Sequence, residues 1–304
     1  MKGIIFLLFS MIMSLQLSCN NGNKKLSPAE LHSISYDSAV TGMERDYFVY
    51  LPQGYHTHPE KKWPVMLFLH GNGERGDGKE DLDYVLIHGP LYEAWIQKRD
   101  LPFIMIVPQL PMFNMDEEAD YLRNRTRDSI PVRLEEGVPE RPDNFPTPEE
   151  MAGSPADDTI NLPPEGPPMG WFLLEDELLA MIDRTLADYK TDASKVYLTG
   201  ISYGGFGSWY LASKHPDRFS AFAPVVGYGH PELMKPLAGN QVPVWCFAGG
   251  RDPVVPARFF YPGLNELEEL GHENVMFTVH EDMGHDTWKR IYAGSDLYDW
   301  MLSH

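Results

Sequence analysis

Cysteine and basic residues are both scarce in this chain of 304 residues. Its 2 cysteines, Cys19 and Cys246, are too few for a disulfide framework or a cysteine-rich zinc site. Its 25 Lys and Arg residues are outnumbered by 44 Asp and Glu residues, which gives a formal net charge of -19. Proteins that bind nucleic acid neutralise phosphates with a basic surface. We therefore expect no nucleic-acid partner.

Long apolar runs are also lacking, except near the N-terminus. Residues 4–17 are mostly apolar but too short for a typical membrane span, and Cys19 follows directly after a small residue. This pattern resembles a bacterial lipoprotein signal. We expect a signal peptide over residues 1–19, a tether over residues 20–29, and an extracytoplasmic protein attached to a membrane only through lipidated Cys19. The alternatives are ordinary cleavage near Ser18 and an uncleaved anchor.

Short apolar runs alternate with helix-length segments in the rest of the chain, residues 30–304. Apolar runs that are shorter than a helix and bounded by Gly or Pro predict strands buried on both faces, as in a parallel sheet. The apolar runs are residues 65–69, 103–107, 195–199, 242–247 and 275–279, and an aromatic run at 45–51 predicts one more strand. The helix-length segments are residues 82–98, 172–189, 206–214, 264–270 and 291–302. The alternation predicts an α/β fold.

Residues 112–170 do not follow this alternation. They contain 10 of the 26 prolines, and 14 acidic residues against 5 arginines. A segment without apolar periodicity does not form a core of its own, so we expect an insertion and not a second domain. It follows the strand predicted at 103–107, at the edge where parallel sheets carry their sites. It is expected to be either a lid or pocket wall, or a surface loop without a role.

The pentapeptide Gly-Ile-Ser-Tyr-Gly at residues 200–204 has the pattern of a nucleophile elbow. A predicted strand leads into it and a predicted helix leaves it, as that turn requires. The glycines allow the strand and helix to approach closely, and the helix N-terminus directs free N–H groups toward the serine. Ser202 is therefore the candidate nucleophile.

A serine hydroxyl needs a base to take its proton, and a carboxylate to orient that base. Asp252 follows the strand predicted at 242–247, and His285 lies in the loop beyond the last predicted strand. These are the positions that an acid and a base take in this arrangement. His280 competes with His285 but lies at the end of the strand pattern. Asp282 and Asp286 compete with Asp252 but are close in sequence to His285.

The buried strand at 65–69 runs into a glycine-rich loop, His-Gly-Asn-Gly at residues 70–73. Acyl transfer needs two N–H donors aimed at the developing oxyanion. The backbone N–H groups of Asn72 and Tyr203 are the candidate donors. His70 is expected to fix the loop. Polar residues that follow the loop are candidates for contacts with the substrate or for surface positions: Glu74, Arg75 and Asp77.

These motifs resemble the α/β-hydrolase superfamily, and within it the secreted esterase and predicted-peptidase branch related to polyhydroxybutyrate depolymerases and feruloyl esterases. The resemblance covers about residues 45–304, except the insertion. It implies the α/β-hydrolase fold, with a mostly parallel central sheet and helices on both faces. By the same resemblance Ser202 is the nucleophile, His285 the base and Asp252 the acid. The matching segments are residues 50–55, 69–76, 107–109, 196–205 and 284–288.

The function expected on this basis is a serine hydrolase that cleaves carboxylic esters through an acyl-enzyme, without a metal or cofactor. Its substrate is expected to be a small-molecule ester or an acyl ester on a plant polysaccharide, such as a feruloyl or acetyl ester. One alternative is a serine peptidase of the prolyl-oligopeptidase-like type. Another is a non-catalytic surface binding protein on a hydrolase scaffold, although such a protein has no need to keep all three triad groups.

Overall fold

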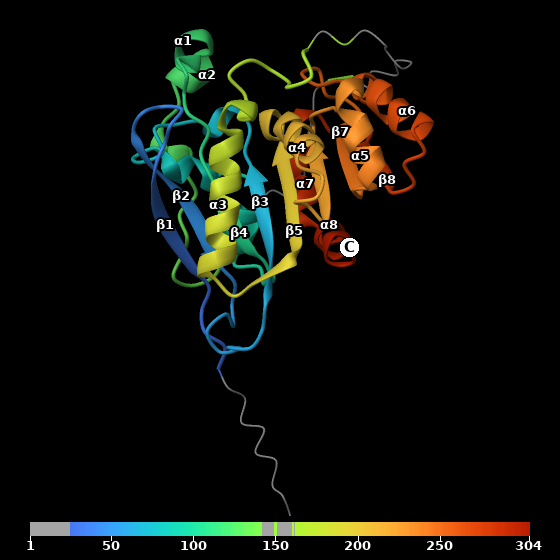
Figure 1. The fold of residues 1–304 in the computed structure, drawn as a ribbon. Coiled ribbons are helices and arrows are strands. Elements are labelled where there is room, and N and C mark those ends of the chain that lie inside the picture. Colours follow the sequence, from blue (N-terminus) through green and yellow to red (C-terminus); the bar gives the residue numbers. More distant parts are fainter. Residues whose placement is uncertain (1–24, 142–148, 151–159, 161) are drawn as a thin grey trace, which may run out of the picture.

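The computed structural model describes residues 25–141, 149–150, 160 and 162–304, so the predicted signal peptide and Cys19 lie outside the described residues. An eight-stranded sheet has the order β1-β2-β4-β3-β5-β6-β7-β8 (Figure 1). β2 pairs antiparallel with both β1 and β4, and the other neighbours pair in parallel. The strands are β1 (Glu30–Asp37), β2 (Glu44–Leu51), β3 (Trp63–Leu69), β4 (Ile104–Val107), β5 (Thr191–Ile201), β6 (Ala221–Val225), β7 (Val244–Gly249) and β8 (Val275–His280).

Helices cover both faces of this sheet, and the predicted mostly parallel sheet of an α/β-hydrolase fold is confirmed (Figure 1). The α-helices are α1 (Met115–Glu118), α2 (Asp120–Arg123), α3 (Glu175–Asp188), α4 (Tyr203–Lys214), α5 (Met234–Asn240), α6 (Tyr261–Glu269), α7 (Trp288–Ala293) and α8 (Asp296–Leu302). Short helical turns used below are η1 (Asn72–Glu74), η2 (Leu82–Leu86), η3 (Tyr92–Ile96) and η5 (Trp171–Leu174).

The predicted helix at 82–98 is wrong. The segment forms the short turns η2 and η3, separated by Gly89 and Pro90. Gly89 has a φ of 88°, and an added Cβ would lie 2.2 Å from the ring of Phe68. A continuous helix through this point would require negative φ and would lose a backbone hydrogen bond at the proline.

Other differences concern strands and helices, among them α5, which was not predicted. β1 and β6 were not predicted, because the first is polar on alternate residues and the second is only five residues long. β8 is partly exposed and not buried on both faces, since it forms the edge of the sheet. The helix predicted at 291–302 is two helices, α7 and α8, which are separated at Gly294.

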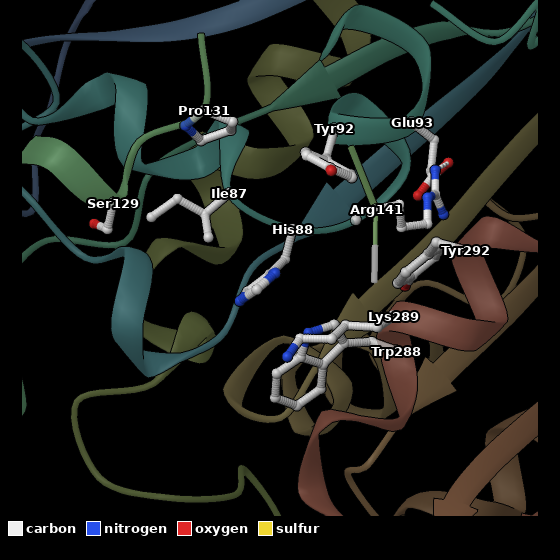
Figure 2. Close-up of a pocket in the computed structure, with 11 residues that line it drawn as sticks. Ile87, His88, Tyr92, Glu93, Ser129, Pro131, Arg141, Trp288, Lys289 and Tyr292 are labelled. Atoms are coloured by element: carbon white, nitrogen blue, oxygen red, sulfur yellow. Dashed lines mark hydrogen bonds and ion pairs between the residues drawn. The ribbon is translucent and has the colours of Figure 1, made fainter. Parts of the chain in front are cut away.

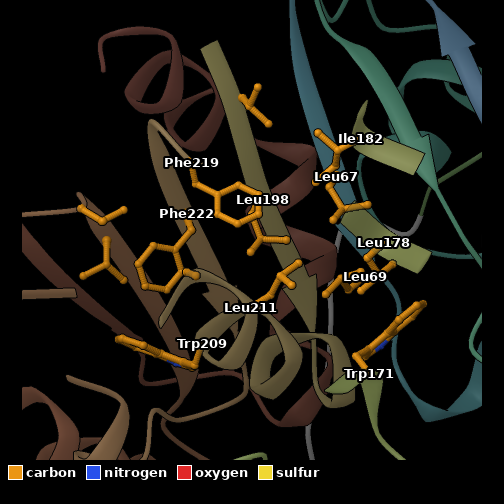
Figure 3. Packing of buried hydrophobic residues seen from close by; sticks show 14 of the residues in the cluster. Leu67, Leu69, Trp171, Leu178, Ile182, Leu198, Trp209, Leu211, Phe219 and Phe222 are labelled. Carbon is orange, nitrogen blue, oxygen red and sulfur yellow. The ribbon is translucent and has the colours of Figure 1, made fainter. Parts of the chain in front are cut away.

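The core lies in two clusters, one on each face of the sheet. In the cluster of Figure 3, Trp171 of η5 and Leu178 of α3 cover Leu69 of β3, and α4 covers the neighbouring part of the sheet. Burying a large apolar side chain stabilises a fold by roughly 1.5–3 kcal/mol. This packing fixes the carboxyl ends of β3 and β5, between which the candidate site lies.

Arginines hold the described part of the insertion against the domain. Their ion pairs with side chains of the domain are Arg125 with Asp81 (2.9 Å), Arg127 with Asp83 (3.2 Å) and Arg141 with Glu93 (2.5 Å). Apolar contacts add to these pairs, because Leu122 is buried and Leu162 packs against the core. The described parts of residues 112–170 therefore contact the domain at several points.

None of the helices in the described part of the chain is both long and apolar enough to cross a membrane. Cys246 lies on β7 with its side chain fully buried, and its Sγ donates to the carbonyl of Met276. Burial raises the pKa of this thiol well above its usual value. A buried thiol with a raised pKa is a poor nucleophile.

Candidate active site

Ser202 lies in a sharp turn between β5 and α4. Its φ of 51° and ψ of -112° are strained for a residue other than glycine. The turn is closed by hydrogen bonds from the Ser202 N–H to Val225 and from the Phe206 N–H to Ser202. An added Cβ on Gly204 would lie 1.8 Å from the carbonyl oxygen of Leu69, so this position requires glycine. The backbone thus presents the serine hydroxyl at the carboxyl edge of the sheet.

The structure brings Ser202, His285 and Asp252 together in one chain of hydrogen bonds. Ser202 Oγ lies 3.1 Å from His285 Nε2, and His285 Nδ1 lies 2.8 Å from Asp252 Oδ2. Because a carboxylate only accepts, Nδ1 carries the ring proton and Nε2 is free to accept from the serine. This is the geometry that a serine nucleophile and its base require.

Asp252 is fixed by its own surroundings. It is 2 % exposed, and its Oδ1 accepts from the N–H groups of Val254 and Val255 at 2.8 and 2.9 Å. The second carboxylate oxygen is thereby left for His285. A buried carboxylate that accepts three hydrogen bonds is held in one orientation, as an orienting acid must be.

The competing residues make other contacts. Asp282 forms an ion pair with Arg290 through both carboxylate oxygens, and Asp286 pairs with Lys289 at 2.7 Å. His280 stacks on Phe247 at the end of β8 and lines a different cavity.

The glycine-rich loop after β3 forms η1, which places Asn72 in the same cavity as Ser202 and His285, and Tyr203 at the start of α4 lines that cavity too. His70 holds this loop from beneath. Its Nε2 accepts from the N–H of Leu110, so its Nδ1 carries the proton and donates to the carbonyl of Gly71. Full burial lowers the pKa of His70 to about 3, so its ring is neutral.

Arg75 connects both candidate oxyanion donors with the two ends of the insertion. Its guanidinium is fully buried, donates to the side-chain oxygen of Asn72 and lies 4.8 Å from the ring centre of Tyr203. It also donates to the carbonyls of Pro111 and Met169 at 2.8 and 2.7 Å. Sequence reasoning placed Arg75 near the loop but gave no signal for these contacts. Asp77, by contrast, is exposed and accepts from backbone N–H groups of its own turn.

Parts of the chain are similar to known esterases. Residues 171–293 match the model of the Esterase family, described as "Putative esterase". Feruloyl esterase B of Neurospora crassa is 40% identical over 94 residues, which are 30% of this chain and 27% of that protein. Poly(3-hydroxyalkanoate) depolymerase C of Paucimonas lemoignei is 40% identical over 47 residues, 16% of this chain and 11% of that protein. The chain is thus similar to members of the esterase branch of the α/β-hydrolase superfamily.

A solved structure titled a thermostable esterase has the same fold. Its TM-score is 0.57 at 23% identity, over 90% of this chain and 62% of that one. The chain thus spans less than a third of either curated relative and under two thirds of this structure. The matched family region contains Ser202, Asp252 and His285, whereas Asn72 lies outside it.

The cavity around Ser202, here called the catalytic pocket, has a volume of about 370 Å³. Side chains that the sequence analysis did not single out line it beside the predicted ones: His88, Tyr121, Val254 and Trp288. Tyr121 belongs to the insertion, and its hydroxyl accepts from the amide of Asn72. His88 and Tyr121 do not directly follow a predicted strand, and Val254 and Trp288 follow the same strands as Asp252 and His285 but have no acid, base or nucleophile that would have singled them out.

Glu74 also lines the catalytic pocket, and it is 5 % exposed. Burial raises the pKa of its carboxyl group to about 7, although hydrogen bonds to backbone N–H groups of its own turn oppose the shift. Its oxygens lie 3.8 Å from His70 Nδ1 and 4.0 Å from His88 Nε2. The carboxyl group therefore changes its charge near neutral pH, within the wall of the site.

An apolar pocket lies on one side of Ser202. It has a volume of about 320 Å³ and shares Ser202, Tyr203 and Val254 with the catalytic pocket. Its other lining residues are mostly aromatic or aliphatic: Leu162, Pro167, Phe206, Tyr228, Val255 and Phe259. Such a surface is suited to an apolar group attached to the carbonyl that the serine attacks.

Proposed function

We propose that this chain is a serine hydrolase that cleaves carboxylic esters through an acyl-enzyme. One observation carries the proposal: Ser202 in a strained elbow is hydrogen-bonded to His285, which is hydrogen-bonded to buried Asp252. The family match and the named relatives, an esterase and a depolymerase, support ester cleavage.

In this mechanism Ser202 Oγ attacks the ester carbonyl while His285 Nε2 takes its proton, and Asp252 stabilises the imidazolium. The carbonyl oxygen becomes an oxyanion, which accepts from the backbone N–H groups of Tyr203 and Asn72. The tetrahedral intermediate collapses, the C–O bond to the alcohol breaks, and His285 protonates the departing alkoxide. Water then attacks the acyl-enzyme by the same route and releases the acid.

The apolar pocket beside Ser202 favours an apolar or aromatic acyl group. Tyr228 and Phe259 form part of its wall, with ring centres 5.7 Å apart. A feruloyl group is planar, aromatic and of a size that such a pocket accommodates. Acyl esters on plant polysaccharides are therefore our proposed substrates, with feruloyl ahead of acetyl.

The test is labelling with a fluorophosphonate and turnover of p-nitrophenyl acetate. The wild-type chain should be labelled and should turn over the ester. Ser202→Ala should not be labelled, and its turnover should keep only a residual acceleration of roughly 10³ to 10⁴ over water. Ser220→Ala is the matched control, because Ser220 lies away from the site and only donates to a backbone carbonyl. A wild-type chain that is not labelled and turns over no ester would support the binding protein.

A substrate panel separates the esterase from the peptidase. Amide and ester cleavage share the attack and the oxyanion, but they differ in the leaving group. For each ester, kcat/KM is divided by the intrinsic reactivity of that ester. We expect the corrected value to be higher for methyl ferulate than for p-nitrophenyl acetate. Peptide anilides should not be cleaved. Faster cleavage of a peptide anilide than of any ester would favour the serine peptidase.

We also propose that the enzyme acts outside the cytoplasm, anchored through a lipid on Cys19. The proposal rests on the apolar run followed by a small residue and cysteine. Incorporation of labelled palmitate into the wild-type chain, but not into Cys19→Ala, would support it. Equal labelling of both would contradict it.

A further inference from the structure

A further cavity, here called the charged pocket, adjoins the catalytic pocket and shares no lining residue with the apolar pocket. Its volume is about 250 Å³, below the range of about 300–1,000 Å³ typical of sites for drug-sized ligands. It therefore has room for one ring-sized group. Figure 2 shows Trp288 and His88 facing one another at one end, and Arg141 against Glu93 at the other.

Two side chains connect the charged pocket with the catalytic pocket, because His88 and Trp288 line both. The ring of Trp288 also lies edge-on to that of His285, with centres 5.2 Å apart. In the proposed reaction His285 protonates the departing alkoxide, so the alcohol must lie on the side of His285. The charged pocket is thus placed to hold the alcohol part of an ester whose carbonyl is at Ser202.

The charges in this pocket are predominantly positive. Glu93 is 2 % exposed, and one of its oxygens accepts from both Arg99 and Arg141, at 3.4 and 2.5 Å. Arg99 lies behind the wall, so the charged groups of the lining are the anion Glu93 and the cations Arg141 and Lys289, which leaves one positive charge in excess. Lys289 also lines the pocket, paired with Asp286 at 2.7 Å. In a chain with a net charge of -19 this local excess is unusual.

The pocket is also rich in hydrogen-bond donors. Arg141, Lys289 and Trp288 carry donors and no acceptors in their side chains. The indole Nε1 of Trp288 is buried and has no partner within the described residues. His88 is uncharged at neutral pH, because burial and the nearby Lys289 lower its pKa to about 4. An anion in the pocket would be attracted by the charges of Arg141 and Lys289, and a carboxylate matches the planar guanidinium of Arg141 in particular.

Building on the proposed function, we propose that the charged pocket binds the alcohol part of the ester, and that this part is a ring-sized group bearing a carboxylate. The carboxylate accepts from Arg141 and Lys289, and the ring lies against Trp288. Both a sugar acid and a hydroxybenzoate have this chemistry.

Matched pairs of esters test the proposal and distinguish the two kinds of ring. One pair is the acetyl ester of 3-hydroxybenzoate and that of 3-hydroxybenzamide; the other is acetylated methyl glucuronoside and acetylated methyl glucoside. After correction for intrinsic reactivity, kcat/KM should be about tenfold higher for the carboxylate member of at least one pair, mainly through a lower KM. A ratio at or below 1 in both pairs would overturn the proposal.

Variants locate the effect. Arg141→Gln and Lys289→Gln should each reduce the preferred pair's ratio toward 1, by raising KM for the carboxylate member. Arg127→Gln is the matched control, because Arg127 is an insertion arginine that pairs with Asp83 outside this pocket. It should keep the wild-type ratio. An unchanged ratio in both pocket variants, with thermal unfolding like that of wild type, would assign the preference elsewhere and overturn the proposal.

Binding provides a readout that does not depend on turnover. Ser202→Ala is titrated with 3-hydroxybenzoate, 3-hydroxybenzamide, glucuronate and glucose, followed by tryptophan fluorescence. At least one acid should bind more tightly than its neutral counterpart, and Arg141→Gln should abolish that difference. If no acid binds more tightly than its neutral counterpart, the proposed role of the charged pocket is overturned, whether or not esters are cleaved. Failure to cleave p-nitrophenyl acetate would instead overturn the proposed function.

Discussion

The triad and the walls around it are held in place by different kinds of contact. Ser202 is fixed by backbone hydrogen bonds, and Asp252 accepts from two backbone N–H groups in a buried setting. The insertion, by contrast, contributes Tyr121 to the catalytic pocket, Leu162 to the apolar pocket and Arg141 to the charged pocket. Its ion pairs with the domain are partly exposed.

This difference has an energetic consequence. Close-packed backbone leaves almost no alternative position for the triad, as the contact between Gly204 and Leu69 illustrates. An exposed ion pair such as that of Arg127 with Asp83 contributes only about 0–1 kcal/mol, whereas the carboxylate that pairs with Arg141 is buried. Most of the insertion can therefore change without much effect on the sheet. We expect changes in the sheet-borne residues to affect the reaction, and changes in the insertion to affect the choice of substrate.

The largest effect is expected for Asp252→Asn, which tests the region carried by the sheet. An amide can donate to His285 Nδ1 and so favours the tautomer whose Nε2 cannot accept from Ser202. We expect kcat to fall by about 10⁴, with little change in KM, in steady-state assays with p-nitrophenyl acetate. Asp282→Asn is the control, since Asp282 pairs with Arg290 at the surface. Comparable losses in both variants would contradict the assigned role of Asp252.

Arg75→Met should have the next largest effect, because Arg75 belongs to both regions. The substitution removes donors to Asn72, Pro111 and Met169, and the cation over Tyr203. A displacement of about 1 Å in a positioned group can lower a rate by about 10²-fold, so we expect kcat to fall 10- to 100-fold. Arg75→Lys should restore little, since one ammonium cannot reach the same partners.

Two measurements distinguish this positioning role from a purely structural one. A loss of stability alone would lower the amount of active enzyme, as titration with a fluorophosphonate shows, without lowering kcat per active site. Arg123→Met is the control, because Arg123 is an exposed insertion arginine. A normal kcat per labelled site in Arg75→Met would contradict the prediction.

The same division explains what the sequence could predict. Strand, glycine turn and helix are local patterns. The elbow at Ser202 and the positions of Asp252 and His285 after strands could therefore be predicted from the sequence. The geometry then places these three residues within hydrogen-bonding distance. Polar β1 and five-residue β6 were missed, since their patterns are weak, and Gly89 together with Pro90 was not recognised as a break.

The contacts of the insertion could not be predicted from local patterns. Arg141 reaches Glu93 across 48 residues, and Met169 accepts from Arg75 across 94. An arginine in an acidic, proline-rich segment is predicted to be exposed to solvent. Nothing in the spacing of these arginines identifies a partner far away in the chain. The same holds for Trp288, whose position between two pockets follows from tertiary structure alone.

Replacing residues 116–167 by a short Gly/Ser linker tests the insertion directly. Loop closure depends only weakly on length, so we expect the domain to fold, with a lower Tm because buried Leu122 and the arginine contacts are lost. KM should rise about tenfold for methyl ferulate and much less for p-nitrophenyl acetate, in keeping with the loss of one pocket wall. Equal changes for both substrates, or none for either, would reject the role of the insertion as a pocket wall.

The smallest effect is expected for Glu74→Gln and concerns pH. Burial raises the pKa of Glu74 to about 7, so its carboxyl group is neutral below that pH and negative above it. Its charge would then lie in the pocket in which the oxyanion forms, partly offset by Arg125 and next to the neutral rings of His70 and His88. Like charges repel, so kcat/KM of the wild type should fall a few-fold as pH rises from 7 to 9, while Glu74→Gln stays level. Glu80→Gln, an exposed neighbour on the same loop, should follow the wild-type profile. The same decline in Glu74→Gln as in the wild type would show that another group causes it, and that the carboxyl group of Glu74 serves the fold of the loop and not the charge of the site.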